Sequence, residues 1–83
     1  MRVIVADDST LLREGLVRVL REGGHEGVGA FGDADALLAG VAELAPGLVV
    51  LDVRMPPGYR DEGVRAAIEL RRRHAGLGIL LLS

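Results

Sequence analysis

Three short apolar runs, set far apart along the chain, constrain its fold more than any other feature of the sequence. They are Val3–Ala6, Leu48–Leu51 and Ile79–Leu82. Runs of this length, rich in valine, isoleucine and leucine, are typical of strands and far too short to cross a membrane. The second run is apolar at every position, as in a strand that is covered on both faces. We therefore expect these runs to form strands of a layered domain.

The segments between these runs carry apolar residues at helical spacing, and each begins beside a residue that can cap a helix. The predicted caps are Ser9 or Asp8, then Asp33, then Asp61. A weaker strand, Glu26–Phe31, is expected between the first two helices. The residues expected to face the core from the helices are, in chain order, Leu12, Leu16, Val19 and Leu20, then Ala34, Leu37, Leu38 and Val41, then Val64, Ala67 and Ile68.

The alternation of strand and helix predicts the fold class. It implies an α/β domain with a parallel sheet and helices on both faces, and right-handed crossovers restrict the topology. If the first strand lies between the second and the third, the winding direction reverses at that point. Ligands bind at such a reversal, beyond the carboxyl ends of the strands.

Carboxylates follow two of the strands that meet at this point. Asp7 and Asp8 follow the first run, and Asp52 follows the run over 48–51. Neighbouring strands lie about 4.8 Å apart, so we expect the three side chains to be close. Two like charges about 4 Å apart repel by about 4 kcal/mol at an effective dielectric constant of 20. A retained proton or a bound cation relieves that repulsion.

An all-oxygen cluster suits a hard cation such as Mg²⁺. A hard cation beside a partly exposed carboxylate is chemistry for phosphoryl groups, with one carboxylate as the nucleophile. The plain alternative is that the three residues are helix caps and polar strand ends. Their convergence on one end of the sheet disfavours that alternative.

The composition excludes several classes of function. Eighty-three residues suffice for one small domain. A net charge of −2 and the scarcity of aromatic residues, Phe31 and Tyr59 alone, argue against a nucleic-acid surface. The chain has no cysteine, so it holds no disulfide framework and no thiolate zinc site. It also has no signal-peptide core, and we expect it in the cytoplasm.

These motifs, in this order and at this spacing, resemble the receiver domain of two-component response regulators. Val3–Ser9 is similar to that family's first strand and acidic pair, and Leu51–Pro56 to its phosphoacceptor strand and following loop. Leu12–Leu16 and Asp61–Gly63 resemble the NarL/LuxR-type subfamily, whose members bind DNA through a C-terminal helix-turn-helix. The resemblance covers the whole chain and implies a flavodoxin-like sheet with strand order 2-1-3-4-5.

The resemblance also implies a role for each site residue. Asp52 would take phosphate from the phosphohistidine of a sensor histidine kinase. Asp8 would bind Mg²⁺ directly, Asp7 directly or through water, and the backbone carbonyl of Arg54 would be a further ligand. Ser83 matches the hydroxyl residue that turns toward the phosphoryl group. The chain would then be a signalling domain that assists its own phosphorylation and dephosphorylation, rather than an enzyme. It would control transcription through a C-terminal DNA-binding helix-turn-helix that lies outside these residues.

The sequence departs from the family in two ways. The loop over Pro57–Asp61 is longer than usual, and two interpretations stay open: a solvated loop, which its composition favours, and an insert that shapes partner access or dephosphorylation. The second departure is that the chain has no lysine to pair with phosphate and no counterpart of the fourth helix, fifth strand and fifth helix. We therefore expect residues 1–83 to form an incomplete receiver domain. Ile79–Leu82 would be an open apolar edge strand, and we expect self-association through it.

Two other functions fit parts of the sequence. The string Gly27-x-Gly29-x-x-Gly32, with Asp52 twenty residues further on, fits the dinucleotide-binding fingerprint. That fingerprint should follow a strand, and it leaves Asp7 and Asp8 unexplained. A receiver-like module that binds a partner without being phosphorylated fits the missing lysine, but it leaves the three carboxylates without a role.

Overall fold

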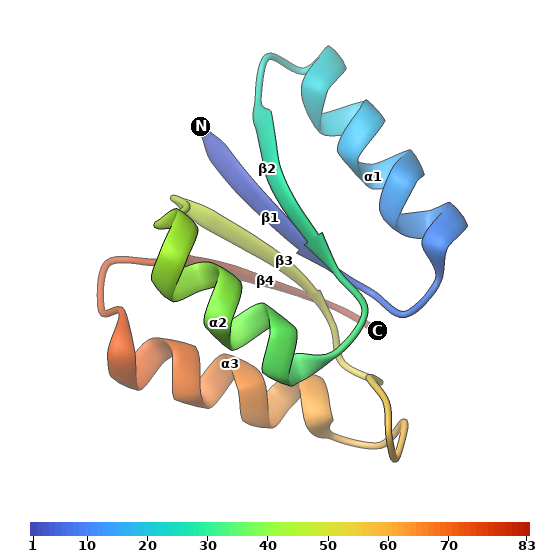
Figure 1. Cartoon of the computed structure of the whole chain (residues 1–83), viewed down its shortest axis with the longest axis vertical. Coiled ribbons are helices and arrows are strands. Elements are labelled where there is room, and N and C mark those ends of the chain that lie inside the picture. The colour runs from blue at the N-terminus through green and yellow to red at the C-terminus, as the bar shows by residue number, and fades with distance from the viewer.

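Four parallel strands form one sheet in the computed structural model, which describes residues 1–83 (Figure 1). The strand order is β2-β1-β3-β4, so the expected order is confirmed for the four strands present. The elements are β1 Arg2–Ala6, α1 Thr10–Glu22, β2 Glu26–Phe31, α2 Ala34–Leu44, β3 Leu48–Asp52, α3 Glu62–Arg73 and β4 Gly78–Leu82.

β1 and β3 occupy the centre of the sheet and pair in parallel, with Val3 opposite Leu48 and Ala6 opposite Leu51. This register places the residues that follow the two strands, Asp7 and Asp52, at the same end of the sheet. The first strand lies between the second and the third, so the winding direction reverses between β1 and β3.

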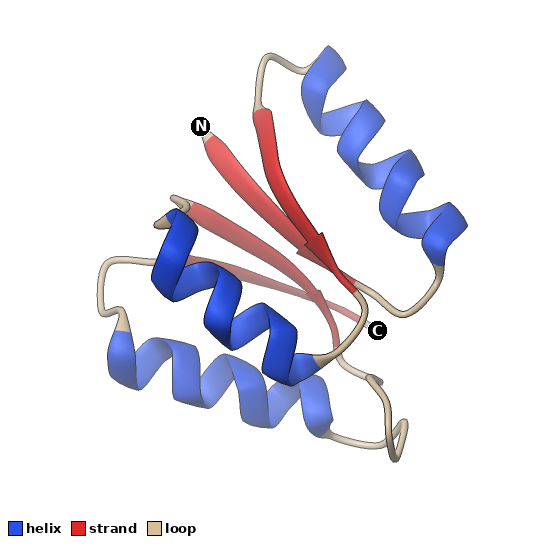
Figure 2. Ribbon diagram, viewed as in Figure 1, coloured by secondary structure: helices blue, strands red, loops and turns tan.

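Helices cover both faces of the sheet, but unequally (Figure 2). α2 and α3 lie side by side on one face, whereas α1 lies apart from them and contacts only β1 and β2 (Figure 1). Alternate residues of β1 point to opposite faces. Ile4 and Ala6 join the core under α2 and α3, and Val3 and Val5 join the core under α1.

The predicted core face of the first helix was partly wrong. Leu12 and Val19 are 46% and 64% exposed, while Leu16, Val17 and Leu20 pack on the sheet. The apolar residues of α1 form two overlapping stripes, and the small residue at Gly27 on β2 lets Val17 approach the sheet closely. The helix therefore turns Val17 inward and Val19 outward.

A similar correction applies to the third helix. Ile68 is 58% exposed, and the buried residues of α3 are Gly63, Ala66 and Leu70. The reason is the close approach of the helix start to β3, where a Cβ on Gly63 would overlap the carbonyl oxygen of Asp52. The stripe of α3 that contains Gly63 is thus the stripe that faces the sheet. The core positions predicted for α2, Leu37 and Val41 among them, are confirmed.

Two of the three predicted caps are confirmed. The Ser9 hydroxyl accepts the N–H of Leu12 at 3.2 Å, and the Asp33 carboxylate accepts the N–H of Ala36 at 2.8 Å. Asp61 stands at the cap position of α3 but accepts no cap hydrogen bond, because its carboxylate pairs with Arg65 at 3.2 Å. None of the helices combines the length and the apolar character that crossing a membrane requires.

Candidate functional site

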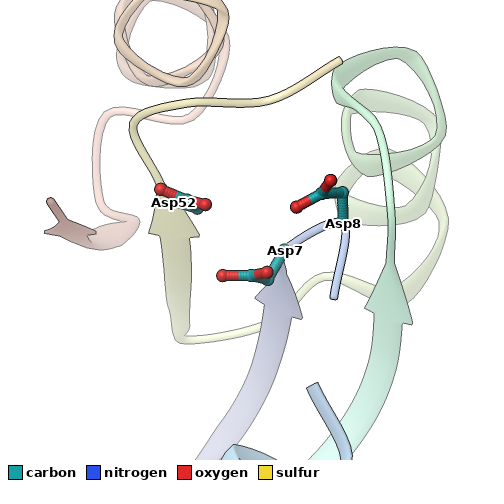
Figure 3. A group of neighbouring side chains, drawn as sticks. All are labelled: Asp7, Asp8 and Asp52. Atoms are coloured by element: carbon teal, nitrogen blue, oxygen red, sulfur yellow. The ribbon is translucent and has the colours of Figure 1, made fainter. Parts of the chain in front are cut away.

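Three carboxylates meet at the carboxyl ends of the two central strands. Asp7 and Asp8 come directly after β1, and Asp52 is the last residue of β3 (Figure 3). Each offers an oxygen, and these oxygens all lie within 4.8 Å of one another. The predicted convergence is therefore present.

The three side chains differ in burial, and this sets their electrostatics. Asp7 is 3% exposed, Asp52 is half-buried and Asp8 is exposed. Burial raises the pKa of Asp7, and the neighbouring charges of Asp52 and Asp8 raise it further. The N–H of Ser9, which donates to the Asp7 carboxylate at 2.9 Å, opposes that rise in pKa. A cation at this point would stabilise the charged form of all three groups.

Hydrogen bonds of the backbone around Asp52 fix the position of that residue in the cluster. The N–H of Arg54 donates to the Asp52 carboxylate at 3.1 Å, and the N–H of Val53 donates to the carbonyl of Leu82 at 2.9 Å. The N–H of Gly63 donates to the carbonyl of Val53 at 2.8 Å, which fixes the start of α3 against the end of β3. Asp52 is therefore held from both sides while its carboxylate keeps access to solvent.

The donor set fits a hard divalent cation. All three groups supply carboxylate oxygens, which are the ligands that Mg²⁺ prefers, and Mg²⁺ completes its octahedron with water. Zinc and copper favour imidazole or thiolate ligands, and neither is part of this cluster. Arg54 contributes its N–H to Asp52, and the role of its carbonyl as a ligand stays a prediction.

Ser83 lies outside the carboxylate cluster. It directly follows Leu82, the residue of β4 that pairs with Asp52 in the sheet, and it is exposed. Its position in the chain is thus adjacent to the strand end that carries Asp52. A switching role for its hydroxyl stays a prediction.

Two residues near the cluster were missed by the sequence reasoning. The Arg13 guanidinium donates to the backbone carbonyl of Asp7 at 2.6 Å and to the Thr10 hydroxyl at 3.2 Å, tying α1 to the end of β1. The neighbouring Asp8 carboxylate raises the pKa of the Tyr59 phenol. The unusual length of the loop was the only sequence signal for Tyr59, and no pattern indicated Arg13.

The dinucleotide-binding interpretation is excluded by the position of its glycines. Gly27 and Gly29 lie inside β2 rather than in a turn after a strand. Their role is packing: a Cβ on Gly27 would crowd Val17, and one on Gly29 would crowd Phe31. Because these two positions carry no side chain, Val17 of α1 and the ring of Phe31 can pack close to the backbone of β2.

Comparison with known proteins identifies the family. The sequence profile of the response regulator receiver domain matches residues 3–83. The chain is 44% identical over 70 residues to the transcriptional regulatory protein PdtaR of Mycobacterium tuberculosis, covering 83% of the chain and 32% of PdtaR. It is 36% identical to the probable transcriptional regulatory protein NarL of the same organism, covering all of the chain and 38% of NarL.

The same likeness is seen in a solved structure. The isolated REC domain of RcsB from Salmonella enterica serovar Typhimurium, solved in the presence of the phosphomimetic BeF3⁻, superposes with a TM-score of 0.86 at 27% identity. The match covers 98% of the chain and 59% of that structure. The chain spans about a third of the length of the two curated relatives. It belongs to the family of response regulator receiver domains.

Proposed function

We propose that this chain is the phosphoacceptor part of a two-component response regulator, and that Asp52 takes phosphate from the phosphohistidine of a sensor histidine kinase. The observation that carries the proposal is the meeting of three carboxylates at the switch point of the sheet, with the half-buried one on β3. Membership of the receiver family supports it. As a receiver, the chain is a signalling domain rather than a member of a classical enzyme family.

The reaction assigns a different task to each carboxylate. A carboxylate oxygen of Asp52 attacks phosphorus, the P–N bond to the kinase histidine breaks, and the imidazole nitrogen keeps the electron pair and takes a proton from solvent. A bound Mg²⁺ would neutralise charge on the phosphoryl oxygens. Asp7 and Asp8 would hold that ion, and the hydrogen bond from Arg54 keeps the Asp52 carboxylate oriented. Loss of the phosphoryl group to water would regenerate the carboxylate.

The output is proposed from the relatives. PdtaR is a transcriptional regulatory protein and NarL a probable one, and each is more than twice as long as this chain. We propose that a longer, cytoplasmic protein carries this domain, and that its additional residues supply the phosphate-pairing lysine, the remaining receiver elements and a DNA-binding helix-turn-helix. Phosphorylation would then shift a two-state equilibrium in that protein.

The test is labelling with a small-molecule phosphodonor, acetyl phosphate, with and without Mg²⁺. We expect an acid-labile mass gain of about 80 Da, one phosphoryl group, only in the presence of Mg²⁺. Asp52→Asn should abolish the gain, and Asp7→Asn and Asp8→Asn should raise the Mg²⁺ concentration that the gain requires. Asp35→Asn is the matched control, because Asp35 is exposed in the first turn of α2 and lies outside the cluster.

The main competing function is a receiver-like module that binds a partner without being phosphorylated. For residues 1–83 by themselves, the absence of lysine favours it. It predicts no labelling of the intact protein under any condition. A label that persisted in Asp52→Asn would instead move the acceptor to another residue.

A further inference from the structure

Gly32, which directly follows β2, leaves room for a side chain of α1. A Cβ at this position would lie 3.1 Å from Nη1 of Arg13 and 4.0 Å from the carbonyl oxygen of Asp7. The first distance is shorter than an ordinary van der Waals contact, so a side chain on Gly32 would press on the guanidinium. The third glycine of the Gly27-x-Gly29-x-x-Gly32 string thus gives space to Arg13, whereas the first two lie within β2.

Arg13 uses this space to bind the backbone at the end of β1. Its Nη1 donates to the carbonyl oxygen of Asp7 at 2.6 Å, and its Nη2 donates to the Thr10 hydroxyl at 3.2 Å. A hydrogen bond from a charged donor is shorter and stronger than one between neutral groups. The side chain is partly buried. The guanidinium therefore ties α1 to the residue that follows β1.

The bond from the guanidinium is one of three that hold Asp7. The N–H of Asp7 donates to the carbonyl of Phe31 at 3.0 Å, and its carboxylate accepts the N–H of Ser9 at 2.9 Å. Asp8 lies between Asp7 and Ser9, and its own side chain is exposed. In Figure 3 the carboxylates of both aspartates point toward Asp52. The path of residues 7–9 therefore sets where two of the three carboxylates stand.

We propose that Arg13 is a positioning residue for the metal site and that Gly32 gives its guanidinium the room to act. The guanidinium fixes the peptide group between Asp7 and Asp8, so that both carboxylates are in place before a cation arrives. This inference rests on the proposed function, because it takes Mg²⁺ to bind these two residues. Mg²⁺ demands nearly ideal octahedral geometry, so its affinity depends on how firmly its few protein ligands are held.

Loss of the guanidinium should affect Mg²⁺ binding in two opposite ways. Removal of a positive charge near the site reduces repulsion of the cation and would tighten binding. Release of the Asp7 carbonyl would loosen the ligands and weaken binding. Groups that orient metal ligands contribute about 10- to 100-fold to affinity, so we expect Arg13→Ala to raise the Mg²⁺ dissociation constant about tenfold. Arg13→Lys keeps the charge and a donor for the carbonyl, and it should recover part of this loss.

A second variant separates position from charge. Gly32→Val leaves Arg13 in the chain but fills the space that its guanidinium occupies, so the dissociation constant should rise although no charge has changed. Arg18→Ala is the matched control, because Arg18 is an exposed residue of the same helix that pairs with Glu22 at 3.4 Å. It should bind Mg²⁺ as the unsubstituted chain does. Titration calorimetry with Mg²⁺ alone measures these constants, and equal thermal unfolding would verify that the fold is retained.

A further measurement needs no metal. Amide hydrogen exchange, followed residue by residue by NMR, reports local opening of the chain. In the metal-free chain the Ser9 N–H, which donates to the Asp7 carboxylate, should lose protection in Arg13→Ala and in Gly32→Val. The N–H groups within β1 and β3 should keep their protection, because the expected opening is confined to residues 7–9.

The outcomes separate the two proposals. Unchanged Mg²⁺ affinity and unchanged protection of Ser9 in both Arg13→Ala and Gly32→Val would overturn the role of Arg13 and leave the proposed function intact. Tighter binding in Arg13→Ala would also overturn that role, because Arg13 would then act through its charge alone. Absence of Mg²⁺ binding from the unsubstituted chain would overturn both proposals. Weaker binding in both variants, with local loss of protection and recovery in Arg13→Lys, supports the role of Arg13.

Discussion

The sheet face under α2 and α3 holds a core of ten buried residues, whereas the face under α1 holds three. α1 itself contains no buried residue, and it covers β1 and β2 only. On the same face, Leu80 of β4 is 51% exposed, although it pairs with the buried Val50 of β3. The α2–α3 face is thus covered except near Leu81 of β4, which is 40% exposed, and the β3–β4 half of the α1 face is open.

This difference separates the face that contributes most to stability from the face that leaves apolar area exposed. Burial of apolar area contributes about 25 cal/mol per Å², so most of the stability of the isolated chain comes from the α2–α3 face. The open half of the α1 face is where further residues or a second molecule would bury additional area. The carboxylate cluster lies at the carboxyl ends of the two central strands, at the edge that both faces share.

The largest expected effect comes from truncating one leucine on each face. Leu37 is fully buried between α2 and the sheet, whereas Leu16 of α1 is half-buried. We expect Leu37→Ala to cost about 2–5 kcal/mol of the free energy of unfolding. Leu16→Ala should cost about 1 kcal/mol, since part of the Leu16 side chain is already in water. Urea denaturation of both variants measures the difference; equal losses would mean that the α1 face is covered in solution.

The second prediction compares two glycine-to-alanine substitutions, one in a helix on each face of the sheet. A Cβ on Gly63 would overlap the backbone of Asp52, so α3 must move, and we expect Gly63→Ala to cost about 1–3 kcal/mol. Gly15 of α1 has nothing within 4 Å of such a Cβ, and Gly15→Ala should stabilise by about 0.5–1 kcal/mol. Thermal unfolding distinguishes the two signs. A stabilising Gly63→Ala would refute the close contact between α3 and β3.

The third prediction concerns the carboxylate cluster and its effect on the pH dependence of stability. The pKa of Asp7 in the folded chain lies above its unfolded value, so its contribution is fully present at low pH and is lost as pH rises through the folded pKa. Without metal, this contribution should fall with rising pH from about pH 4 upward. Asp7→Asn should abolish that slope. Excess Mg²⁺ at neutral pH should raise the stability of the parent chain. A parent chain whose free energy of unfolding responded neither to pH nor to Mg²⁺ would argue against the cluster.

The smallest effect on stability is expected at the open edge. Leu80→Lys places a charge on the edge strand β4 and so disfavours its pairing with another chain. It should change the free energy of unfolding by no more than about 0.5 kcal/mol. The predicted self-association should nevertheless weaken markedly in sedimentation velocity. Leu11→Lys, at an 81% exposed position on α1, makes the same chemical change elsewhere and should leave association as it was. A parent chain that stays monomeric at high concentration would contradict the expected association.

Much of the site could be predicted because it depends on strand ends. Asp7, Asp8 and Asp52 each stand at the end of an apolar run, and parallel strands carry their carboxyl ends to one edge. Arg13 and Tyr59 could not be predicted in this way. The hydrogen bond from Arg13 to Asp7 depends on the rotation of α1, and the position of Tyr59 near Asp8 depends on the path of the loop after β3. Neither leaves a periodic pattern in the sequence.

The sequence by itself determined the order of strands and helices, the parallel sheet and the convergence of three carboxylates, because these follow from local periodicity and from chain connectivity. The tertiary structure alone decided which stripe of each helix faces inward. In α1 and α3 two apolar stripes compete, and the close approach permitted by Gly27 and Gly63 selects one of them. It also decided how unequally the two faces are covered, since coverage depends on how many helices each face receives rather than on any one segment.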